Sequence, residues 1–175
     1  MKENNKNFAY IDGANLHQGI KSLGWKLDYA RFRVWLKEKY NVESAYLFIG
    51  LIAKYKDLYT ALQEAGYILV FKDTIFDGDG KAKGNCDADL VLHAVRDTYE
   101  SDFDRAIIVS SDGDYSSLVS FLKEKNKIHT ILSPRESRKC SLLLKRTGAP
   151  ISYINEQRSI LEALNEKTPD ADGTA

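Results

Sequence analysis

The sequence predicts an α/β fold in which helices cover both faces of a central, mostly parallel sheet. Apolar runs of strand length alternate with segments of helical period along most of the 175 residues. The buried run at residues 106–109 breaks directly into a polar turn and then a helical pattern, as in a βα unit. No internal repeat divides the chain. We therefore expect one domain over residues 1–165 and a flexible tail over 166–175.

The first elements follow from simple apolar patterns. A short apolar run predicts a strand at residues 8–11, and it stops at Asp12. Helical spacing then predicts helices over 16–23 and 29–40. In the second of these, one face carries three apolar side chains, Phe32, Trp35 and Leu36.

The middle of the chain continues the alternation. Residues 42–51 predict the second strand, and the helix predicted over 55–65 is ended by Gly66. The third strand is predicted at 67–71. The glycine-rich stretch 77–84 that follows is expected to be a mobile loop.

The remainder of the chain repeats this order. Residues 86–99 predict the helix that leads into the central strand at 106–109. The later predicted elements are a helix over 115–125, a strand over 128–132, a helix over 137–146, a strand over 151–154 and a helix over 156–164.

The composition limits the classes of function. The 25 basic and 25 acidic residues cancel, so a polyanionic partner must be held by local groups rather than by a global field. There is no apolar leader and no run of membrane-spanning length, which predicts a cytoplasmic protein with no membrane partner. Cys86 and Cys140 lie far apart without metal-ligand spacing, so we expect reduced thiols.

Acidic side chains follow two of the predicted strands. Asp12 ends the strand at 8–11, and Asp112 and Asp114 come just after the strand at 106–109. If these strands are neighbours where the winding of the sheet reverses, the three carboxylates meet in one crevice. Open α/β sheets place their ligands at this edge.

A fourth carboxylate comes from the helix predicted over 86–99, which offers Asp87 and Asp89. Because a helix advances about 100° per residue, Asp87 shares a face with the apolar residues Val91, Ala94 and Val95. Asp89 lies on the polar side with His93 and Arg96, and we expect His93 to be a surface or element-end residue. Asp87 is therefore the inward-facing candidate.

Such a cluster favours a bound cation. Two carboxylates about 4 Å apart repel by roughly 4 kcal/mol at an effective dielectric constant near 20. Three or four such groups would cost a large share of a typical folding stability of about 5–15 kcal/mol. Oxygen ligands of this kind suit Mg²⁺ or Mn²⁺. Each residue also has a local alternative, since Asp12 can form a turn, Asp114 can cap a helix and Asp87 can interact with the helix dipole.

Three segments carry a family resemblance: YIDGANL at 10–16, KGNCDADL at 83–90 and VSSDGDY at 109–115. They resemble the signature segments of NYN domains, most closely the LabA-like branch of the PIN-like nuclease superfamily. The resemblance covers roughly residues 8–155. It implies a PIN-like three-layer sandwich and metal-dependent cleavage of RNA. Cys86 stands where an aliphatic residue is usual, a packing change that we expect to be harmless.

By motif position, the resemblance implies that Asp12, Asp87, Asp112 and Asp114 hold the metal ion, with Asn15 beside them as a further catalytic residue. Asn15 could position a substrate or a water through its amide. Ser110 or Ser111 could bond a phosphate or hold an aspartate in place, and Ser111 could equally be a plain helix-entry residue.

Basic residues in loops at the same edge are candidates for phosphate contacts, which position a nucleic acid without reading its sequence. Lys83 and Arg135 are the leading candidates because they lie nearest the acidic motifs. Others are Lys54, Lys56, Lys81 and Arg138. Tyr115 could stack on a base or pack in the core.

The leading interpretation is a metal-dependent endoribonuclease that acts on RNA, expected to be single-stranded, and leaves 5′-phosphate and 3′-hydroxyl ends. The alternative is a noncatalytic RNA-binding or regulatory module that keeps the fold. A phosphohydrolase of the haloacid dehalogenase type is disfavoured because it needs a second aspartate where this chain has Ala14. The leucines at 142–144 fit a core or an oligomer contact, such as a homodimer.

Overall fold

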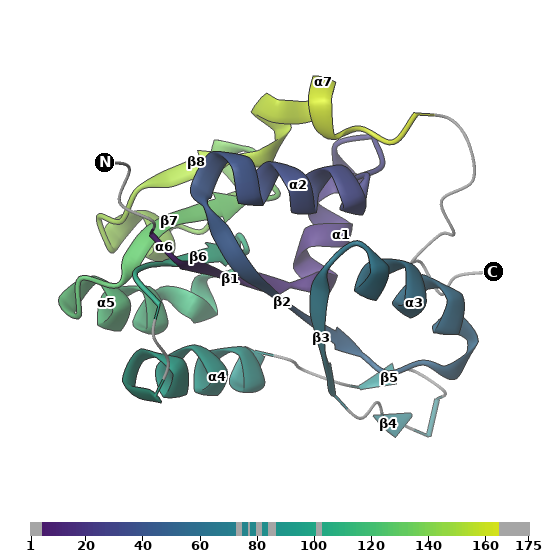
Figure 1. Cartoon of the computed structure of the whole chain (residues 1–175), viewed down its shortest axis with the longest axis horizontal. Coiled ribbons are helices and arrows are strands. Elements are labelled where there is room, and N and C mark those ends of the chain that lie inside the picture. Colours follow the sequence, from purple (N-terminus) through teal and green to yellow (C-terminus); the bar gives the residue numbers. More distant parts are fainter. Residues whose placement is uncertain are drawn as a thin grey trace.

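A six-stranded parallel sheet forms the centre of the molecule, and helices lie on both of its faces (Figure 1). The computed structural model describes residues 5–72, 75–76, 78–79, 82–83, 87–100 and 103–164. The strands of the sheet are β1 (Asn7–Asp12), β2 (Val42–Gly50), β3 (Tyr67–Lys72), β6 (Ala106–Val109), β7 (Ile128–Ser133) and β8 (Ile151–Tyr153). The predicted α/β fold is confirmed, and it is consistent with a PIN-like sandwich.

The strand order is β3-β2-β1-β6-β7-β8, so the winding reverses between β1 and β6. These two strands pair in parallel, with Ile11 opposite Val109. Asp12 and Ser110 therefore leave the sheet side by side at its carboxyl edge. A crevice at such a reversal point is where doubly wound sheets bind ligands.

Two helical layers cover the sheet. The helices are α1 (Gly13–Ser22), α2 (Tyr29–Tyr40), α3 (Lys56–Glu64), α4 (Asp87–Glu100), α5 (Ser116–Glu124), α6 (Leu142–Arg146) and α7 (Arg158–Leu161). Four 3₁₀ turns accompany them: η1 (Ala53–Tyr55), η2 (Gly113–Tyr115), η3 (Ser137–Lys139) and η4 (Ile154–Gln157). The first core contains apolar residues of α1, α2, α3 and α7, and the second those of α4, α5 and α6.

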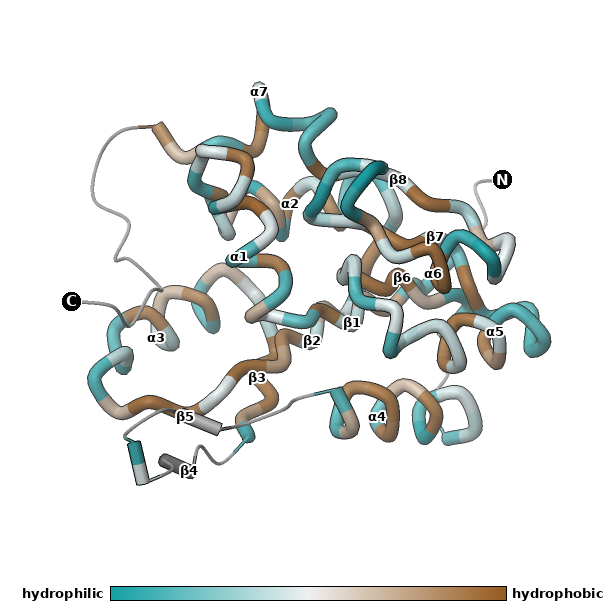
Figure 2. The backbone as a smooth tube through the Cα atoms, turned by 180° about the vertical axis from the view of Figure 1, so that it is seen from behind, coloured by the Kyte–Doolittle hydropathy of each residue, from teal (hydrophilic) through white to brown (hydrophobic). Residues whose placement is uncertain are grey.

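The two cores take alternate residues of each strand, as the pleat requires. Ile11 and Ile107 face the first core, whereas Tyr10 and Ile108 face the second. Figure 2 shows apolar stretches along β3 and α4. Because β1 and β6 are buried on both faces, residues 8–11 of β1 and all of β6 are apolar or aromatic; β1 then ends at Asp12, and Ser110 follows β6.

Helix α4 is attached to the sheet by a buried polar contact that the sequence did not indicate. Tyr10 Oη donates to Asp97 Oδ2 at 3.0 Å, and both residues are buried. His93 Nδ1 lies 3.1 Å from the same oxygen, and its ring packs against Tyr46. The expectation of a surface or element-end position for His93 is therefore wrong, because the residue lies inside α4 with a side chain that is 18% exposed. The contact holds the helix whose first residue is Asp87.

Several element boundaries differ from the expected ones. The helix expected over 16–23 begins three residues earlier, at Gly13, where Asp12 caps it. The stretch 77–84, expected to be a mobile loop, includes the short strand β5 (Ala82–Lys83), which pairs antiparallel with β4 (Ile75–Phe76) just before it. Residues 77, 80, 81 and 84 are outside the described residues. The helix expected over 137–146 is divided into η3 and α6. The backbone N–H of Ser141 bonds to the Ser111 carbonyl oxygen, and its side chain accepts from the Leu143 N–H to start α6.

Helix α7 ends at Leu161, before the expected 164, because the chain then extends and Glu162 forms an antiparallel bridge with Leu27. The tail expected at 166–175 and Cys86 lie outside the described residues, while Cys140 is a free, buried thiol. Within the described ranges no helix has both the length and the apolar character needed to cross a bilayer.

Candidate metal centre

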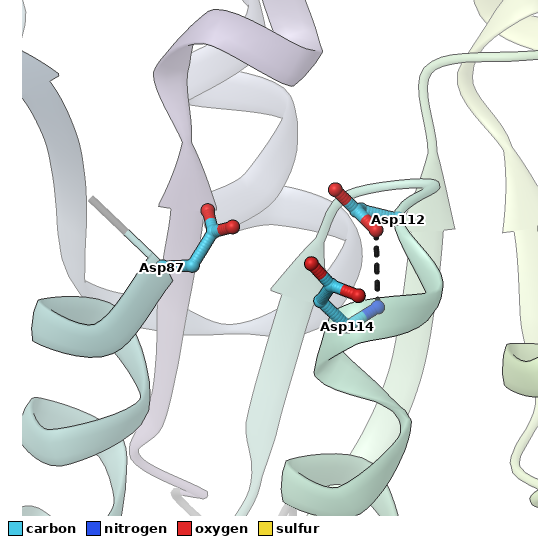
Figure 3. A group of neighbouring side chains, drawn as sticks. All are labelled: Asp87, Asp112 and Asp114. Carbon is cyan, nitrogen blue, oxygen red and sulfur yellow. Dashed lines mark hydrogen bonds between the residues drawn. The ribbon is translucent and has the colours of Figure 1, made fainter. Parts of the chain in front are cut away.

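Three carboxylates from two separate segments converge at the carboxyl edge of the sheet. One oxygen each of Asp87, Asp112 and Asp114 lies within 4.8 Å of the others. Figure 3 shows Asp87 at the start of α4 facing Asp112 and Asp114 in the turn after β6. Asp87 and Asp112 are half-buried and Asp114 is exposed, so the cluster is open to solvent on one side. This set could hold a metal ion.

The turn after β6 is ordered by its own side chains. Asp112 caps η2, because its Oδ1 accepts from the backbone N–H of Asp114 at 3.0 Å (Figure 3). The backbone N–H of Asp112 in turn donates to Ser110 Oγ at 3.1 Å. The local capping role considered for Asp114 thus belongs to Asp112. This hydrogen bond fixes the orientation of the Asp112 carboxylate and leaves the carboxylate able to act as a metal ligand as well.

Asp12 lies behind this cluster at the end of β1 and is 6% exposed. Its Oδ1 accepts from the backbone N–H of Asn15 at 3.1 Å, so Asp12 is the N-cap of α1. The next residue, Gly13, lets the helix approach β2, since an added Cβ would lie 2.8 Å from the Phe48 carbonyl oxygen. The turn expected at Asp12 is therefore present as a helix cap.

The hydroxyl of Tyr115 connects Asp12 to the three-carboxylate cluster. Tyr115 Oη lies 3.1 Å from Asp12 Oδ2 and 2.6 Å from Asp87 Oδ1. A phenol carries one proton, so it donates to only one of the two carboxylates at a time. Tyr115 is fully buried and cannot stack on a base from solvent. The sequence offered base stacking or packing for this residue but held no signal for the bridging role.

The electrostatics disfavour several negative charges at this site without a cation. Burial raises the pKa of the Asp12 carboxyl, and the nearby charges of Asp87 and Asp112 raise it further, against the hydrogen bonds from Asn15 and Tyr115. Burial and the Asp12 charge also hold the pKa of the Tyr115 hydroxyl far above its usual value. Among the described residues, the ion pairs include no lysine or arginine bonded to Asp112 or Asp114. A bound cation would supply the missing positive charge.

Asn15 and Ser111 clamp the ends of β1 and β6 together. Asn15 Oδ1 accepts from the backbone N–H of Ser111 at 2.9 Å and from Ser111 Oγ at 3.0 Å. Ser111 is buried, so its hydroxyl is used inside the protein. The amide nitrogen of the half-buried Asn15 is the group that this pair can offer to a substrate.

The basic residues predicted to contact phosphate are distributed around this edge. Arg135 follows β7, is half-buried, and its Nε has no hydrogen-bond partner among the described residues. Lys54 and Lys56 are exposed after β2, and the exposed Arg138 lies 3.6 Å from Glu136. The backbone of Lys83 lies in β5; its side chain and all of Lys81 lie outside the described residues.

The chemistry of the donors fits a hard divalent cation. The clustered groups offer carboxylate oxygens only, with no thiol or imidazole in the group. The buried Asp12 adds a fourth carboxylate through the Tyr115 bridge. Mg²⁺ and Mn²⁺ both suit such a set.

Comparison with known proteins supports the family and the fold. The family model described as the NYN domain matches residues 8–148, which include all four aspartates. A solved structure of a protein of unknown function from Vibrio parahaemolyticus is similar, with 24% identity and a TM-score of 0.74. The match covers 93% of this chain and 99% of that one. That likeness concerns the fold alone. No curated protein matches the chain.

Proposed function

Because this chain belongs to the NYN domain family, a nuclease-like family, we propose that it is a metal-dependent endoribonuclease of the LabA-like branch. The observation that carries the proposal is the convergence of Asp87, Asp112 and Asp114 beside the buried Asp12. The substrate is RNA in single-stranded form, and the metal ion is Mg²⁺ or Mn²⁺.

In this proposal Asp87, Asp112 and Asp114 hold the ion. The buried Asp12, joined to Asp87 through Tyr115, adds a fourth negative charge near the ion. A bound divalent ion would polarise the scissile phosphate and lower the pKa of a water. Tyr115 and the cap at Asp112 fix the carboxylates before substrate arrives, so little reorganisation is needed.

Groups around the carboxylates would hold the strand. The Asn15 amide donates to substrate or water, while the Ser111 hydroxyl keeps that amide in place. Lys83 and Arg135 contact phosphates next to the scissile one. A direct contact between Ser111 and a phosphate would require the Ser111 hydroxyl to give up its hydrogen bond to Asn15. Phosphate contacts position RNA without selecting a sequence.

The test is cleavage of an end-labelled single-stranded RNA by the purified protein with Mg²⁺ or Mn²⁺. We expect cleavage that EDTA abolishes and products with 5′-phosphates. Asp87→Asn and Asp112→Asn should each reduce the rate at least about 100-fold, because each removes a ligand charge. The matched control is Asp89→Asn, the same change two residues along α4, which should stay within about 2-fold.

RNA binding without cleavage in either metal, unchanged by EDTA and by Asp112→Asn, would contradict the nuclease. It would instead identify a noncatalytic RNA-binding module on the same fold. If Asp87→Asn, like the Asp89→Asn control, kept the activity of the wild type, the cluster would not be the reaction site.

A further inference from the structure

A cleft separate from the carboxylates lies between α1 and α3, over the carboxyl end of β2. It encloses about 240 Å³. One face of α1 supplies Ala14, His17 and Gln18, which are spaced as one helical face. The facing wall comes from α3 and its preceding turn, with Tyr55, Leu58, Tyr59 and Leu62. We call this space the α1–α3 cleft.

The walls of the cleft are aromatic and aliphatic, with few polar groups. Three tyrosines line it: Tyr29, Tyr55 and Tyr59. The Tyr59 hydroxyl is already engaged, because it accepts from the Ile52 N–H and donates to the Gly50 carbonyl oxygen, both at 3.0 Å. These bonds hold the loop after β2 in place. The cleft wall is therefore preformed on this side.

The Tyr55 hydroxyl differs from that of Tyr59. It is buried and has no hydrogen-bond partner among the described residues. A buried polar group without a partner is costly, so such groups are rare unless a ligand or a water completes them. Because this oxygen is closed to solvent in the free protein, a ligand in the cleft reaches it only when the Tyr55 ring shifts; a donor or an acceptor on the edge of the ligand would then supply the missing bond.

The cleft opens at the same sheet edge as the candidate metal centre. Gly13 and Ala14, which line it, directly follow Asp12. Asp12 pairs with Phe48 in the sheet, and the next residues of β2, Ile49 and Gly50, form part of the cleft. Neighbouring strands lie only about 4.8 Å apart. The cleft is on the α1–α3 face and the carboxylates are on the α4 side, so a chain whose phosphate lies at the carboxylates would cross the edge of the sheet past the exposed Ala14 to place an adjacent group in the cleft.

Positive charge lies beside the cleft. Lys54 Nζ lies 5.1 Å from the centre of the Tyr55 ring, and Lys56 is exposed next to it. An uncharged aliphatic ligand would make no favourable electrostatic interaction with these cations. A planar base attached to a phosphate would use the aromatic wall, the Tyr55 hydroxyl and the cations together.

We propose that the α1–α3 cleft binds one unstacked nucleobase of the RNA, from a nucleotide adjacent to the scissile phosphate. This assignment rests on the proposed ribonuclease function for its substrate class. It adds a subsite, next to the carboxylates but formed by other residues, that would select or anchor a base.

The binding test measures each of the four 5′-mononucleotides by calorimetry on EDTA-treated protein, with ribose 5-phosphate as the probe that lacks a base. We expect at least one nucleotide to bind at least about 10-fold more tightly than ribose 5-phosphate. Tyr55→Phe should weaken that binding about 5-fold, the effect of one hydrogen bond. Its melting temperature should not fall, because the lost hydroxyl has no partner among the described residues of the free protein.

A blocking variant tests the site without touching the core. Ala14 is exposed at the rim, so Ala14→Phe should fold normally and reduce nucleotide binding at least about 10-fold. The control is Ala30→Phe, an exposed alanine in the first turn of α2 that does not line the cleft. It should bind like the wild type.

Cleavage kinetics separate the cleft from the metal centre. Ala14→Phe should raise the KM for RNA and leave kcat within about 3-fold. Asp112→Asn should lose cleavage and keep nucleotide binding, so a failure of the nuclease proposal would leave the cleft result standing. If the cleft bound nucleotides but Ala14→Phe left the KM for RNA unchanged, the assignment of the cleft to the RNA strand would be overturned. Wild-type protein that binds no nucleotide better than ribose 5-phosphate would overturn the cleft as a base site.

Discussion

At the scale of single residues, one hydroxyl proton is placed between two carboxylates. Tyr115 Oη reaches both Asp12 and Asp87, and it can donate to only one of them at a time. Asp12 is almost completely buried. The free protein therefore carries an electrostatic cost at this point, which a cation would offset.

Asp12→Asn tests that cost. An asparagine keeps the cap on α1, and its amide nitrogen can donate to Tyr115, which then donates to Asp87 without conflict. Because burial raises the pKa of Asp12, the stability linked to this group is full at acidic pH and is lost as the pH rises through the raised pKa. In EDTA the variant should therefore be more stable than the wild type at pH 7, with a smaller difference near pH 4.

Urea unfolding at both pH values in EDTA measures this difference. Adding Mn²⁺ should stabilise the wild type and have a weaker effect on the variant. A variant that is less stable than the wild type at pH 7 in EDTA would show that the Asp12 charge is well accommodated without a cation.

At the scale of elements, the site depends on how α1 and α4 are seated on the sheet. Helix α1 begins at the residue after Asp12, against β2, and α4 begins with Asp87. Each helix has a close contact with the sheet that a single substitution can disturb: Gly13 for α1 and the Tyr10–Asp97 hydrogen bond for α4.

Gly13→Ala should move α1 away from β2. The added Cβ would collide with Ile49 Cγ2 and lie 2.8 Å from the Phe48 carbonyl oxygen. We expect a loss of about 1–3 kcal/mol in the free energy of unfolding. Gly78→Ala is the control, because a Cβ added there would have no neighbour within 4 Å among the described residues, and it should change stability by less than about 0.5 kcal/mol. Equal unfolding midpoints in urea would contradict the close approach.

Tyr10→Phe should loosen α4. It removes a buried hydrogen bond and leaves Asp97, which is 4% exposed, with one fewer donor. The expected cost is about 1–3 kcal/mol, measured by thermal or urea unfolding. Tyr99→Phe on the same helix changes a side chain that is 67% exposed and should be close to neutral. If the two variants were equally stable, the Tyr10 contact would not anchor the helix.

At the scale of the whole molecule, sequence periodicity predicted the architecture and much of the site's location. Alternating apolar runs indicated the parallel sheet. The strand-end positions of Asp12 and Asp112 predicted a shared crevice on the condition that their strands are neighbours, and β1 and β6 do pair. The helical period favoured Asp87 over Asp89, and Asp87 is the residue that lies with Asp112 and Asp114.

The features that periodicity missed are contacts between elements. The Tyr115 bridge, the Tyr10–Asp97 contact and the break at Ser141 each join segments that are distant in sequence. A local pattern shows which face of a helix is apolar, but it does not show which polar side chain of another element will form a hydrogen bond with that helix. Hydrogen bonds between elements become visible only once the strand order and register are known.

The most direct test of the metal centre is anomalous diffraction from a crystal of the protein soaked in Mn²⁺. We expect an anomalous peak bound by the carboxylates of Asp87, Asp112 and Asp114, and no such peak in Asp112→Asn. A soaked crystal with no peak there, or with the three side chains turned away from one another, would contradict a cation site at this edge of the sheet.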